Sequence, residues 1–400
     1  MTTGGLLSPK VAGALSSNDF MRQRNLSAVL TMLHHDGPRS RSEIVRSTGL
    51  TRSTIAVLTT ELIELGLVQD LGAQVVPGQV GRPSTLVEVD PHVAAIAIHP
   101  ETDAITVGLV GLGGEVIRRV RYDTSTPASA RETVRIVRSI VDGIRADLDD
   151  SYRIVGAGVA VPGLVRVSDG RVLLAPHLGW KNEPIAATLS RALGMFVVAG
   201  NDASIGATGE FVFGAGKGVQ NLVYVNGTAR GIGGGIIIGG TLLNGTEGYA
   251  GELGHTLVNS RGSRCYCGRI GCLETEVNLD RLLPFLGRTF IDEDELDIAL
   301  GVARDPALLR EVARQAELLS EALTNFVNLF SPEMVVLAGY LGALYSAARE
   351  RLAEAVHVQP LGGNARSVRL ERAKLRSRLM LVGGAELVFA SQVLPVAPSQ

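Results

Sequence analysis

The feature that most constrains this chain is a cluster of cysteines, because all three cysteines of its 400 residues fall within one eight-residue stretch. One residue separates Cys265 from Cys267, Cys272 follows, and His255 precedes Cys265 by ten residues. A Zn²⁺ ion takes four nitrogen or sulfur ligands in a tetrahedron. Thiols that lie together without a metal are the alternative interpretation. Because four protein ligands leave no position for water, we predict a structural zinc ion in a knot formed by residues 255–272.

Two acidic residues flank this cluster. Glu252 precedes His255 by three residues, and Glu274 follows Cys272 by two. A histidine that binds a metal through one ring nitrogen normally gives the other nitrogen to a hydrogen-bond partner. A ligand hydroxyl is a candidate for that partner, so the same stretch is expected to bind a ligand.

The strings GYAGELGH (248–255) and CYCGRIGCLE (265–274) closely resemble the signature of the ROK family, which comprises bacterial sugar kinases and sugar-responsive transcriptional repressors. The resemblance covers roughly residues 91 to 400. The preceding residues resemble the DNA-binding domain that only the repressor branch carries. This resemblance implies a sugar-sensing domain at 91–400.

The family resemblance also assigns roles to individual residues. In the kinases, the residue that matches Asp202 is the general base that takes a proton from a sugar hydroxyl. Here Asp202 would do the same, or simply accept a hydrogen bond. The tetrapeptide Gly-Asn-Asp-Ala on its own is more typical of a helix N-cap, so only the resemblance favours a ligand role. The residues that match sugar-contacting positions are Asn201, Asp202, Glu252, His255 and Glu274.

Two further loops match segments that line the same cleft in the family. They are Pro162-Gly163 and the stretch His177-Leu-Gly-Trp180. His177 stands where many relatives carry asparagine, so the identity of the sugar stays open.

The composition describes an ordinary globular chain, with 46% hydrophobic and 20% charged residues, long enough for two or three domains. The net charge of −2 predicts no global attraction to nucleic acid. No apolar run is long enough to cross a bilayer, and the N-terminus lacks a signal-peptide core. We therefore expect a cytoplasmic protein without a membrane partner, in which reduced cysteines favour metal over disulfide.

The first part of the chain predicts a disordered arm at residues 1–17, followed by a winged helix-turn-helix domain at 18–90. A helical pattern covers Asp19 to His34, and Ser40-Arg-Ser-Glu43 is a capping box that opens a short second helix. That helix stops at Gly49. A third helix is expected to begin after Thr51 and end at Gly66, and its predicted buried stripe is Ile55, Leu58, Leu62 and Leu65.

Beyond the third helix, residues 67–74 and 84–90 alternate like the two strands of a hairpin, which predicts a wing. Arg82 lies between Gly81 and Pro83 in this hairpin. An extended arginine suits a narrow minor groove, whereas a plain β-turn with an exposed arginine is the alternative.

Charge within this domain supports DNA binding only locally. Residues 18–90 hold seven arginines and eight acidic residues, but residues 39–52 hold four arginines and one glutamate. That local excess lies where a helix-turn-helix meets phosphates, and its second helix would turn side chains toward the bases of the major groove. A winged module used for protein contacts is the alternative. The residues predicted to contact DNA are Arg41, Thr51, Arg52, Ser53, Ala56 and Arg82.

The remaining residues, 91–400, contain an α/β pattern twice. The first copy has three strands within 94–124, a helix at about 129–147 and a strand at 154–163. The second has strands within 221–245, then mostly helix to Phe330 and a strand at 333–342. This repetition predicts a two-lobed, actin-like (ribonuclease H-like, ASKHA) α/β domain with its ligand between the lobes.

The phosphate-binding loops of the family's kinases are altered here. The kinases carry Asp-x-Gly-Gly-Thr after their first strand, whereas this chain has His99-Pro-Glu101-Thr-Asp103. Both glycines are gone, the proline removes a donor, and Glu101 places negative charge where phosphate would lie. The second loop, 227–235, carries an additional residue and an arginine, and Leu-Ala-Gly at 337–339 replaces the usual Leu-Gly-Gly. Together these departures argue against ATP binding and against an enzyme.

We therefore interpret the chain as a sugar-responsive repressor of carbohydrate uptake or catabolism genes, with a monosaccharide or derivative as effector. In the family, subunits pair through the ROK domain, which implies a homodimer or homotetramer on a palindromic double-stranded DNA operator. A ROK sugar kinase with an added DNA-binding domain, retaining residual activity through Asp202, is one alternative. A zinc-stabilised module whose winged domain binds protein is another.

Overall fold

The computed structural model describes residues 17–73, 85–149, 151–358, 360–361 and 368–396. The predicted arm at 1–17 therefore lies outside the described residues except for Ser17, which begins a helix. The chain divides into two compact units, one formed by residues 1–91 with 390–400 and the other by residues 92–389. Each unit is described by itself below.

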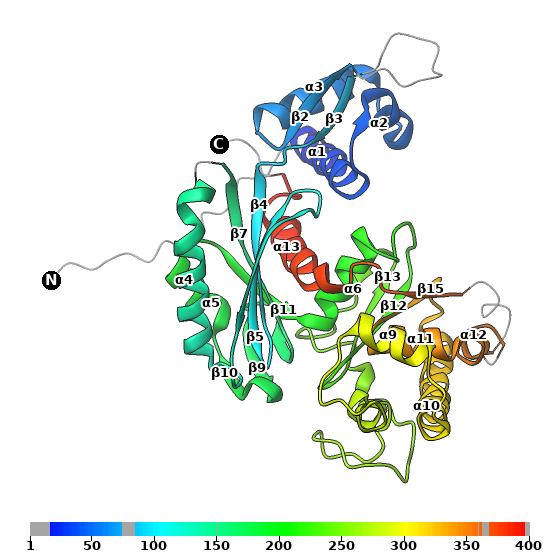
Figure 1. Ribbon diagram of the computed structural model, residues 1–400. Coiled ribbons are helices and arrows are strands. Elements are labelled where there is room, and N and C mark those ends of the chain that lie inside the picture. Colours follow the sequence, from blue (N-terminus) through cyan, green and yellow to red (C-terminus); the bar gives the residue numbers. More distant parts are fainter. Residues whose placement is uncertain (1–16, 74–84, 150, 359, 362–367, 397–400) are drawn as a thin grey trace. The chain divides into compact units, whose positions relative to one another are not determined.

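The first unit is a winged helix-turn-helix (Figure 1). Its three short strands pair antiparallel in the order β1-β3-β2. The capping box predicted at the second helix is present, because the Ser40 side chain accepts from the Glu43 N–H and the Glu43 carboxylate accepts from the Ser40 N–H. The elements are α1 (Ser17–Asp36), β1 (Arg39–Ser40), α2 (Arg41–Thr48), α3 (Arg52–Glu64), β2 (Val68–Ala73) and β3 (Thr85–Val89).

The turn between α2 and α3 forms as the sequence predicts. Gly49 adopts the left-handed conformation that ends α2, and the Thr51 hydroxyl accepts from the Thr54 N–H to open α3. Ile55, Leu58 and Leu62 are buried on the inner face of α3. Leu65 departs from the predicted buried stripe and is partly exposed, because the helix ends at Glu64 and Leu65 forms its C-cap.

Replacing Ser40 by alanine is expected to destabilise α2 by about 1 kcal/mol, because the cap bond to the Glu43 N–H is lost. Amide hydrogen exchange of residues 41–48 should then become roughly fivefold faster. Ser47→Ala is the matched control, because Ser47 lies exposed within the same helix. Equal exchange rates in the two variants would contradict the capping role.

The second unit contains two five-stranded sheets with the same topology. In each sheet the first three strands are antiparallel, the fourth pairs parallel with the first, and the fifth pairs parallel with the fourth. The strand orders are therefore β11-β7-β4-β5-β6 and β14-β13-β12-β15-β16. We call residues 92–201, which hold the first sheet, lobe 1, and residues 214–378, which hold the second, lobe 2. The predicted two-lobed actin-like fold is thus confirmed.

Lobe 1 is built from alternating strands and helices close to those predicted. Its central strands are almost wholly apolar because both faces of the sheet are covered. Its elements are β4 (Val93–Pro100), β5 (Ala104–Gly111), β6 (Val116–Asp123), α4 (Ala130–Asp149), β7 (Arg153–Val161), β8 (Leu164–Arg166), β9 (Arg171–Ala175), η1 (Pro176–Leu178), β10 (Trp180–Glu183), α5 (Ile185–Leu193) and β11 (Val197–Asn201).

Lobe 2 departs from prediction in one segment. The stretch from residue 246 to 272, expected to be mostly helical, contains only a short 3₁₀ helix, because it is glycine-rich and folds around the cysteine cluster. The elements of lobe 2 are β12 (Leu222–Thr228), β13 (Gly231–Ile238), β14 (Thr241–Leu242), η2 (Leu253–His255), α7 (Leu273–Glu276), η3 (Leu279–Arg281), α8 (Leu283–Leu286), α9 (Glu293–Gly301), α10 (Pro306–Phe330), β15 (Met334–Gly339), α11 (Tyr340–Ala347), α12 (Arg349–His357), β16 (Arg369–Arg372) and η5 (Arg376–Arg378).

Two helices, α6 (Asp202–Phe213) and α13 (Leu379–Gln392), connect the lobes and pack on each other (Figure 1). Glycines bring their backbones close: a Cβ on Gly383 of α13 would overlap the carbonyl oxygen of Ile205 in α6. A Cβ on Gly158 of β7 in lobe 1 would likewise overlap the carbonyl oxygen of Gly384, the next residue of α13. On the other side, α6 packs against β13 of lobe 2. The two helices therefore link the lobes through close backbone contacts.

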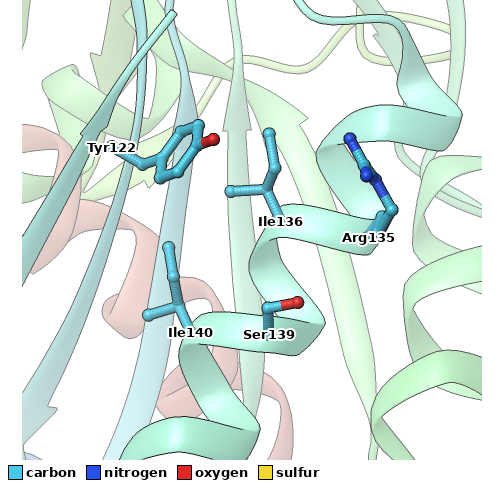
Figure 2. A pocket seen from close by; sticks show the side chains of 5 residues that line it. All are labelled: Tyr122, Arg135, Ile136, Ser139 and Ile140. Atoms are coloured by element: carbon cyan, nitrogen blue, oxygen red, sulfur yellow. The ribbon is translucent and has the colours of Figure 1, made fainter.

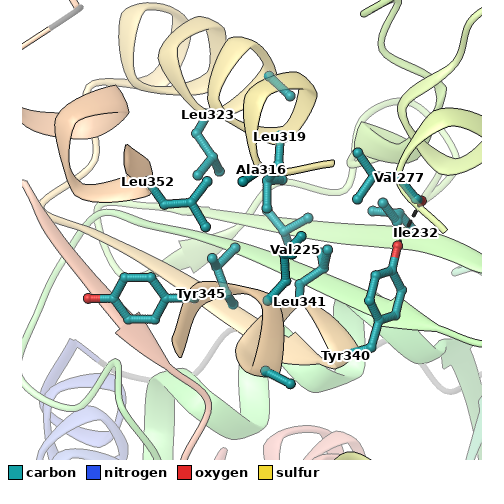
Figure 3. Close-up of a cluster of buried hydrophobic side chains, with 14 of the residues drawn as sticks. Val225, Ile232, Val277, Ala316, Leu319, Leu323, Tyr340, Leu341, Tyr345 and Leu352 are labelled. Carbon is teal, nitrogen blue, oxygen red and sulfur yellow. Dashed lines mark hydrogen bonds between the residues drawn. The ribbon is translucent and has the colours of Figure 1, made fainter. Parts of the chain in front are cut away.

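The core of lobe 2 supports the segment that carries the cysteines. Leu273 and Val277, at the two ends of α7, are fully buried in a cluster with side chains from α10, α11 and α12 (Figure 3). The Tyr340 hydroxyl donates to the carbonyl oxygen of Val277 at 2.7 Å, which fixes the chain just after α7. In the part of the chain that the structure describes, no helix is long and apolar enough to cross a membrane.

Candidate metal and ligand site

The three cysteines and His255 come together as predicted. Their sulfur and nitrogen donor atoms all lie within 4.8 Å of one another. The Sγ atoms of Cys267 and Cys272 are 3.7 Å apart, and Sγ of Cys265 lies 3.5 Å from Nδ1 of His255. In a tetrahedral zinc site with usual bond lengths, these separations are about 3.8 Å for S···S and about 3.6 Å for S···N. The donor set and its spacing therefore fit a tetrahedral metal ion.

Backbone geometry builds this cluster. Bridges between Leu257 and Cys272 and between Arg264 and Ile270 fold residues 255–272 back on themselves. Gly271 has a φ of 77°, and a Cβ there would overlap the carbonyl oxygen of Asn259, so only glycine fits this turn. The cysteines are free thiols in this structure. Burial and the carboxylate of Glu274, which accepts a hydrogen bond from Cys265 at 2.9 Å, raise the pKa of the Cys265 thiol. A bound metal would release this proton.

The imidazole of His255 faces two ways. Its Nδ1 points to the cysteines, whereas Nε2 lies 3.1 Å from the hydroxyl of Tyr266 and 3.8 Å from Oε2 of Glu252. A metal on Nδ1 leaves the ring proton on Nε2 and makes this nitrogen a hydrogen-bond donor. The histidine therefore joins the metal cluster to the groups on its other side.

Two carboxylates, those of Glu252 and Glu274, border this histidine, and the carboxylate of Asp202 lies near enough to Glu252 to act on its charge. Burial raises the pKa of Glu252, the charge of His255 opposes that shift, and Asp202 and Glu274 add to it. Burial likewise raises the pKa of Asp202, against the nearby charge of His99. Glu274 is 7% exposed, and its Oε1 lies 3.3 Å from Nδ1 of His255. The site thus brings together acceptors for hydroxyl groups and a single imidazole donor.

At the start of α6, the roles of helix N-cap and of possible ligand acceptor fall to two different residues. Asn201 is the N-cap: its Oδ1 accepts from the Ser204 N–H, and its Nδ2 donates to the carbonyl oxygen of Gly163, each at 3.0 Å. Asp202, the first helical residue, uses Oδ1 to accept from the Ala203 N–H, at 2.8 Å. A carboxylate accepts several hydrogen bonds, so Asp202 has capacity for a ligand hydroxyl, whereas Asn201 mainly fixes the predicted loop at Gly163.

The other predicted cleft loop contributes His177. Its ring stands edge-on to Tyr266, with centroids 6.2 Å apart. Burial and the guanidinium of Arg230 lower the pKa of His177, and a hydrogen bond to the backbone of Arg230 works against this shift. Trp180 instead lies in the core of lobe 1, where its Nε1 donates to the carbonyl oxygen of Ala128.

The segment that replaces the kinases' phosphate turn is locked in an ion-pair cluster. The guanidinium of Arg121 donates to Glu101, Asp103 and Asp123 at 2.8 to 3.0 Å. Thr106 also donates to Glu101 at 3.0 Å. Three carboxylates and one cation leave a net negative charge, which repels a triphosphate.

The residues predicted to contact DNA differ in their exposure and in the hydrogen bonds they already make. Thr51, Arg52, Ser53 and Ala56 are exposed along one face at the start of α3. Arg41 is partly buried and donates to Thr59 and to Asp70, so it ties α2 to α3 and β2. Arg82 lies outside the described residues.

A separate hollow of about 290 Å³ lies between β6 and α4 (Figure 2). It is lined by Tyr122, Arg135, Ile136, Ser139 and Ile140, none of which was predicted to bind a ligand.

Sequence reasoning missed two residues of the site. The charge of His99 acts on the carboxylate of Asp202 and opposes the rise of its pKa, and Nδ1 of the His99 ring lies 3.0 Å from the carbonyl oxygen of Ala160. Tyr266 reaches Nε2 of His255. Its place between Cys265 and Cys267 was a usable signal, because a residue there must border the cysteine cluster.

Comparisons with known proteins agree with this architecture. The ROK family profile matches residues 95–391, and the profile of the IclR helix-turn-helix domain matches residues 25–72. The xylose repressor of Caldicellulosiruptor bescii is 28% identical over 95% of this chain and 98% of that protein. The DNA-binding transcriptional dual regulator NagC of Escherichia coli K12 is 26% identical over 94% of each chain.

Solved structures give the same result for the fold. A ROK family transcriptional regulator, a homologue of the E. coli MLC protein, superposes with a TM-score of 0.76 at 24% identity, covering 94% of this chain and 97% of that one. A ROK family glucokinase from Streptomyces griseus, in complex with glucose and AMPPNP, reaches 0.63 at 25% identity, covering 74% and 98%.

Proposed function

The chain belongs to the ROK family, and from this membership we propose that it represses carbohydrate uptake or catabolism genes in response to a sugar. The effector in this proposal is a monosaccharide or derivative, bound between the lobes beside a structural zinc ion. Among the family's two branches the chain is a regulator and not an enzyme, because relatives that match it over 94% or more of its length are a xylose repressor and a transcriptional dual regulator. The ion pairs of Arg121 at the altered phosphate turn agree with this assignment.

The observation that carries the proposal is the two-sided position of His255. Nδ1 faces three cysteines, and Nε2 faces the space bordered by Glu252. In the proposed site, His255, Cys265, Cys267 and Cys272 hold Zn²⁺, which fixes the ring so that Nε2 donates to a sugar hydroxyl. Because four protein atoms complete the tetrahedron, the metal orients residues and supplies no reaction.

The carboxylates complete the proposed sugar site. Asp202, through Oδ2, and Glu252 would accept hydrogen bonds from sugar hydroxyls. Glu274 would contact the sugar through its Oε2. This oxygen lies beside the β12–β13 turn, since a Cβ built on Gly231 would be 2.6 Å from Oε2. Asn201 has one amide N–H left for the same purpose, after its bonds to Ser204 and Gly163.

DNA binding is assigned to the first unit. In the proposed complex, the exposed start of α3 enters the major groove with Arg52, Ser53 and Ala56 toward the bases. Thr51 would contact a phosphate, and Arg41 would need to exchange its bond to Asp70 for one. Arg82 would reach the minor groove. The operator is proposed to be palindromic and bound by a homodimer or homotetramer in the cytoplasm.

The test is a gel-shift titration with DNA from upstream of the chain's own gene, in the presence of D-xylose, D-glucose, N-acetylglucosamine and their phosphates. We expect a specific, salt-sensitive complex that one of these sugars changes, most simply by releasing the DNA. Specific binding that no sugar alters would contradict the effector. Failure to bind DNA at any salt concentration would contradict the repressor itself.

A further inference from the structure

The hydroxyl of Tyr266 lies on the cleft-facing nitrogen of His255, at the position where the proposed function places a sugar hydroxyl. We propose that the hydroxyl of Tyr266 occupies the position of a sugar hydroxyl in the sugar-free protein. There it accepts the hydrogen bond of His255, and the sugar displaces it on binding. The displacement by a sugar rests on the proposed function. The hydrogen bond between Tyr266 and His255 does not, because it is present in the structure. It makes Tyr266 an affinity-determining residue.

The geometry of the pair is that of a directed contact. Oη of Tyr266 is 3.1 Å from Nε2 of His255, and the two rings stand at 75° with centroids 5.2 Å apart. Tyr266 is nevertheless 58% exposed. The ring can therefore swing toward solvent without opening the hydrophobic core.

Only one acceptor can use this nitrogen well. With a metal on Nδ1, the imidazole has a single N–H to donate. Oε2 of Glu252 lies 3.8 Å away, beyond hydrogen-bond distance, so the hydroxyl of Tyr266, at 3.1 Å, is the nearer acceptor for that N–H. A sugar hydroxyl that takes the Nε2 proton must break the tyrosine bond first, and this competition lowers the apparent sugar affinity.

Displacement of the tyrosine also changes a contact between the lobes. Tyr266 belongs to the cysteine loop of lobe 2, and its ring meets the edge of His177 in η1 of lobe 1 at an interplanar angle of 79°. A sugar that moves Tyr266 therefore removes one contact of the sugar-free lobe arrangement. Binding free energy is thereby coupled to lobe position, as a ligand response requires.

The first arm of the test needs no sugar. Wild type and Tyr266→Phe, each loaded with one zinc per chain, are labelled with ¹⁵N-histidine, and the Nε2–H signal of His255 is recorded by NMR. We expect a downfield, slowly exchanging signal in wild type that moves upfield and exchanges faster in the variant. Identical signals would overturn the proposal, whatever the protein binds.

The second arm measures affinity by calorimetry with D-xylose, D-glucose and N-acetylglucosamine as probes. We expect Tyr266→Phe to bind the recognised sugar about fivefold more tightly, because one competing hydrogen bond is gone. Tyr122→Phe, which alters another half-exposed tyrosine, is the control and should leave the affinity unchanged. Unchanged or weaker binding by Tyr266→Phe would overturn the displacement. If neither wild type nor either variant binds any of the three sugars, the result would count against the proposed effectors. The NMR measurement would still decide whether the Tyr266–His255 hydrogen bond exists.

Discussion

Replacing Cys265 by serine is expected to weaken sugar binding by about 100-fold or more while the chain remains folded. The change removes one of four proposed zinc ligands, a buried cysteine whose Sγ lies beside Nδ1 of His255. Without the metal, the imidazole has no fixed tautomer or orientation, and residues 255–272 lose the link that closes their loop. Zinc content, calorimetry with the sugar that acts in the gel shift, and hydrogen exchange across 248–276 measure the three consequences.

The fold should survive this loss because the hydrophobic cluster of lobe 2 does not include the cysteines. Leu273 and Val277 anchor the end of the loop in that cluster, and the Tyr340 hydroxyl holds the carbonyl oxygen of Val277. Arg264→Ser is the matched control, because it introduces the same side chain at the exposed neighbouring position. A Cys265→Ser protein that binds sugar as tightly as wild type would refute the coupling between zinc and sugar.

Features governed by local rules were predictable from the sequence. The capping box at Ser40, the left-handed Gly49 and the N-cap at Thr51 depend on residues within three or four positions of each other, and all three are present. The cysteine cluster belongs to the same class, because its closely spaced ligands leave the chain few other ways to fold. The repeated strand order was predictable for a different reason. The apolar pattern of a buried strand can be recognised in the sequence without knowing which strands it pairs with.

The rest of the site depends on partners far away in the sequence. Arg121 meets Glu101 only because β5 and β6 turn the chain back over twenty residues, which no local pattern encodes. Arg41 was predicted to contact DNA, but its bond to Asp70 depends on where β2 packs. Trp180 shows the opposite error: family position suggested a cleft, whereas its indole fills the core of lobe 1.

The second large effect is expected at the contact between α13 and lobe 1. Gly158→Ala should destabilise the second unit by about 3 kcal/mol, because the new Cβ would overlap the carbonyl oxygen of Gly384 and lie 2.7 Å from its carbonyl carbon. Backbone atoms cannot rotate away, so α13 has to move as a body. Thermal unfolding should show a melting temperature lower by about 5 °C.

Gly143→Ala separates this effect from the general consequence of adding a methyl group. Gly143 lies exposed within α4, and no atom lies within 4 Å of the place that its new methyl group would take, so alanine should raise stability by about 0.5 to 1 kcal/mol. Opposite signs for the two substitutions identify the α13–β7 contact as the cause. Since α13 also packs on α6, whose first residue is Asp202, a shifted α13 should weaken sugar binding as well. Equal melting temperatures for Gly158→Ala and wild type would mean that the helix and sheet slide past each other freely, and that the lobes are not coupled through this contact.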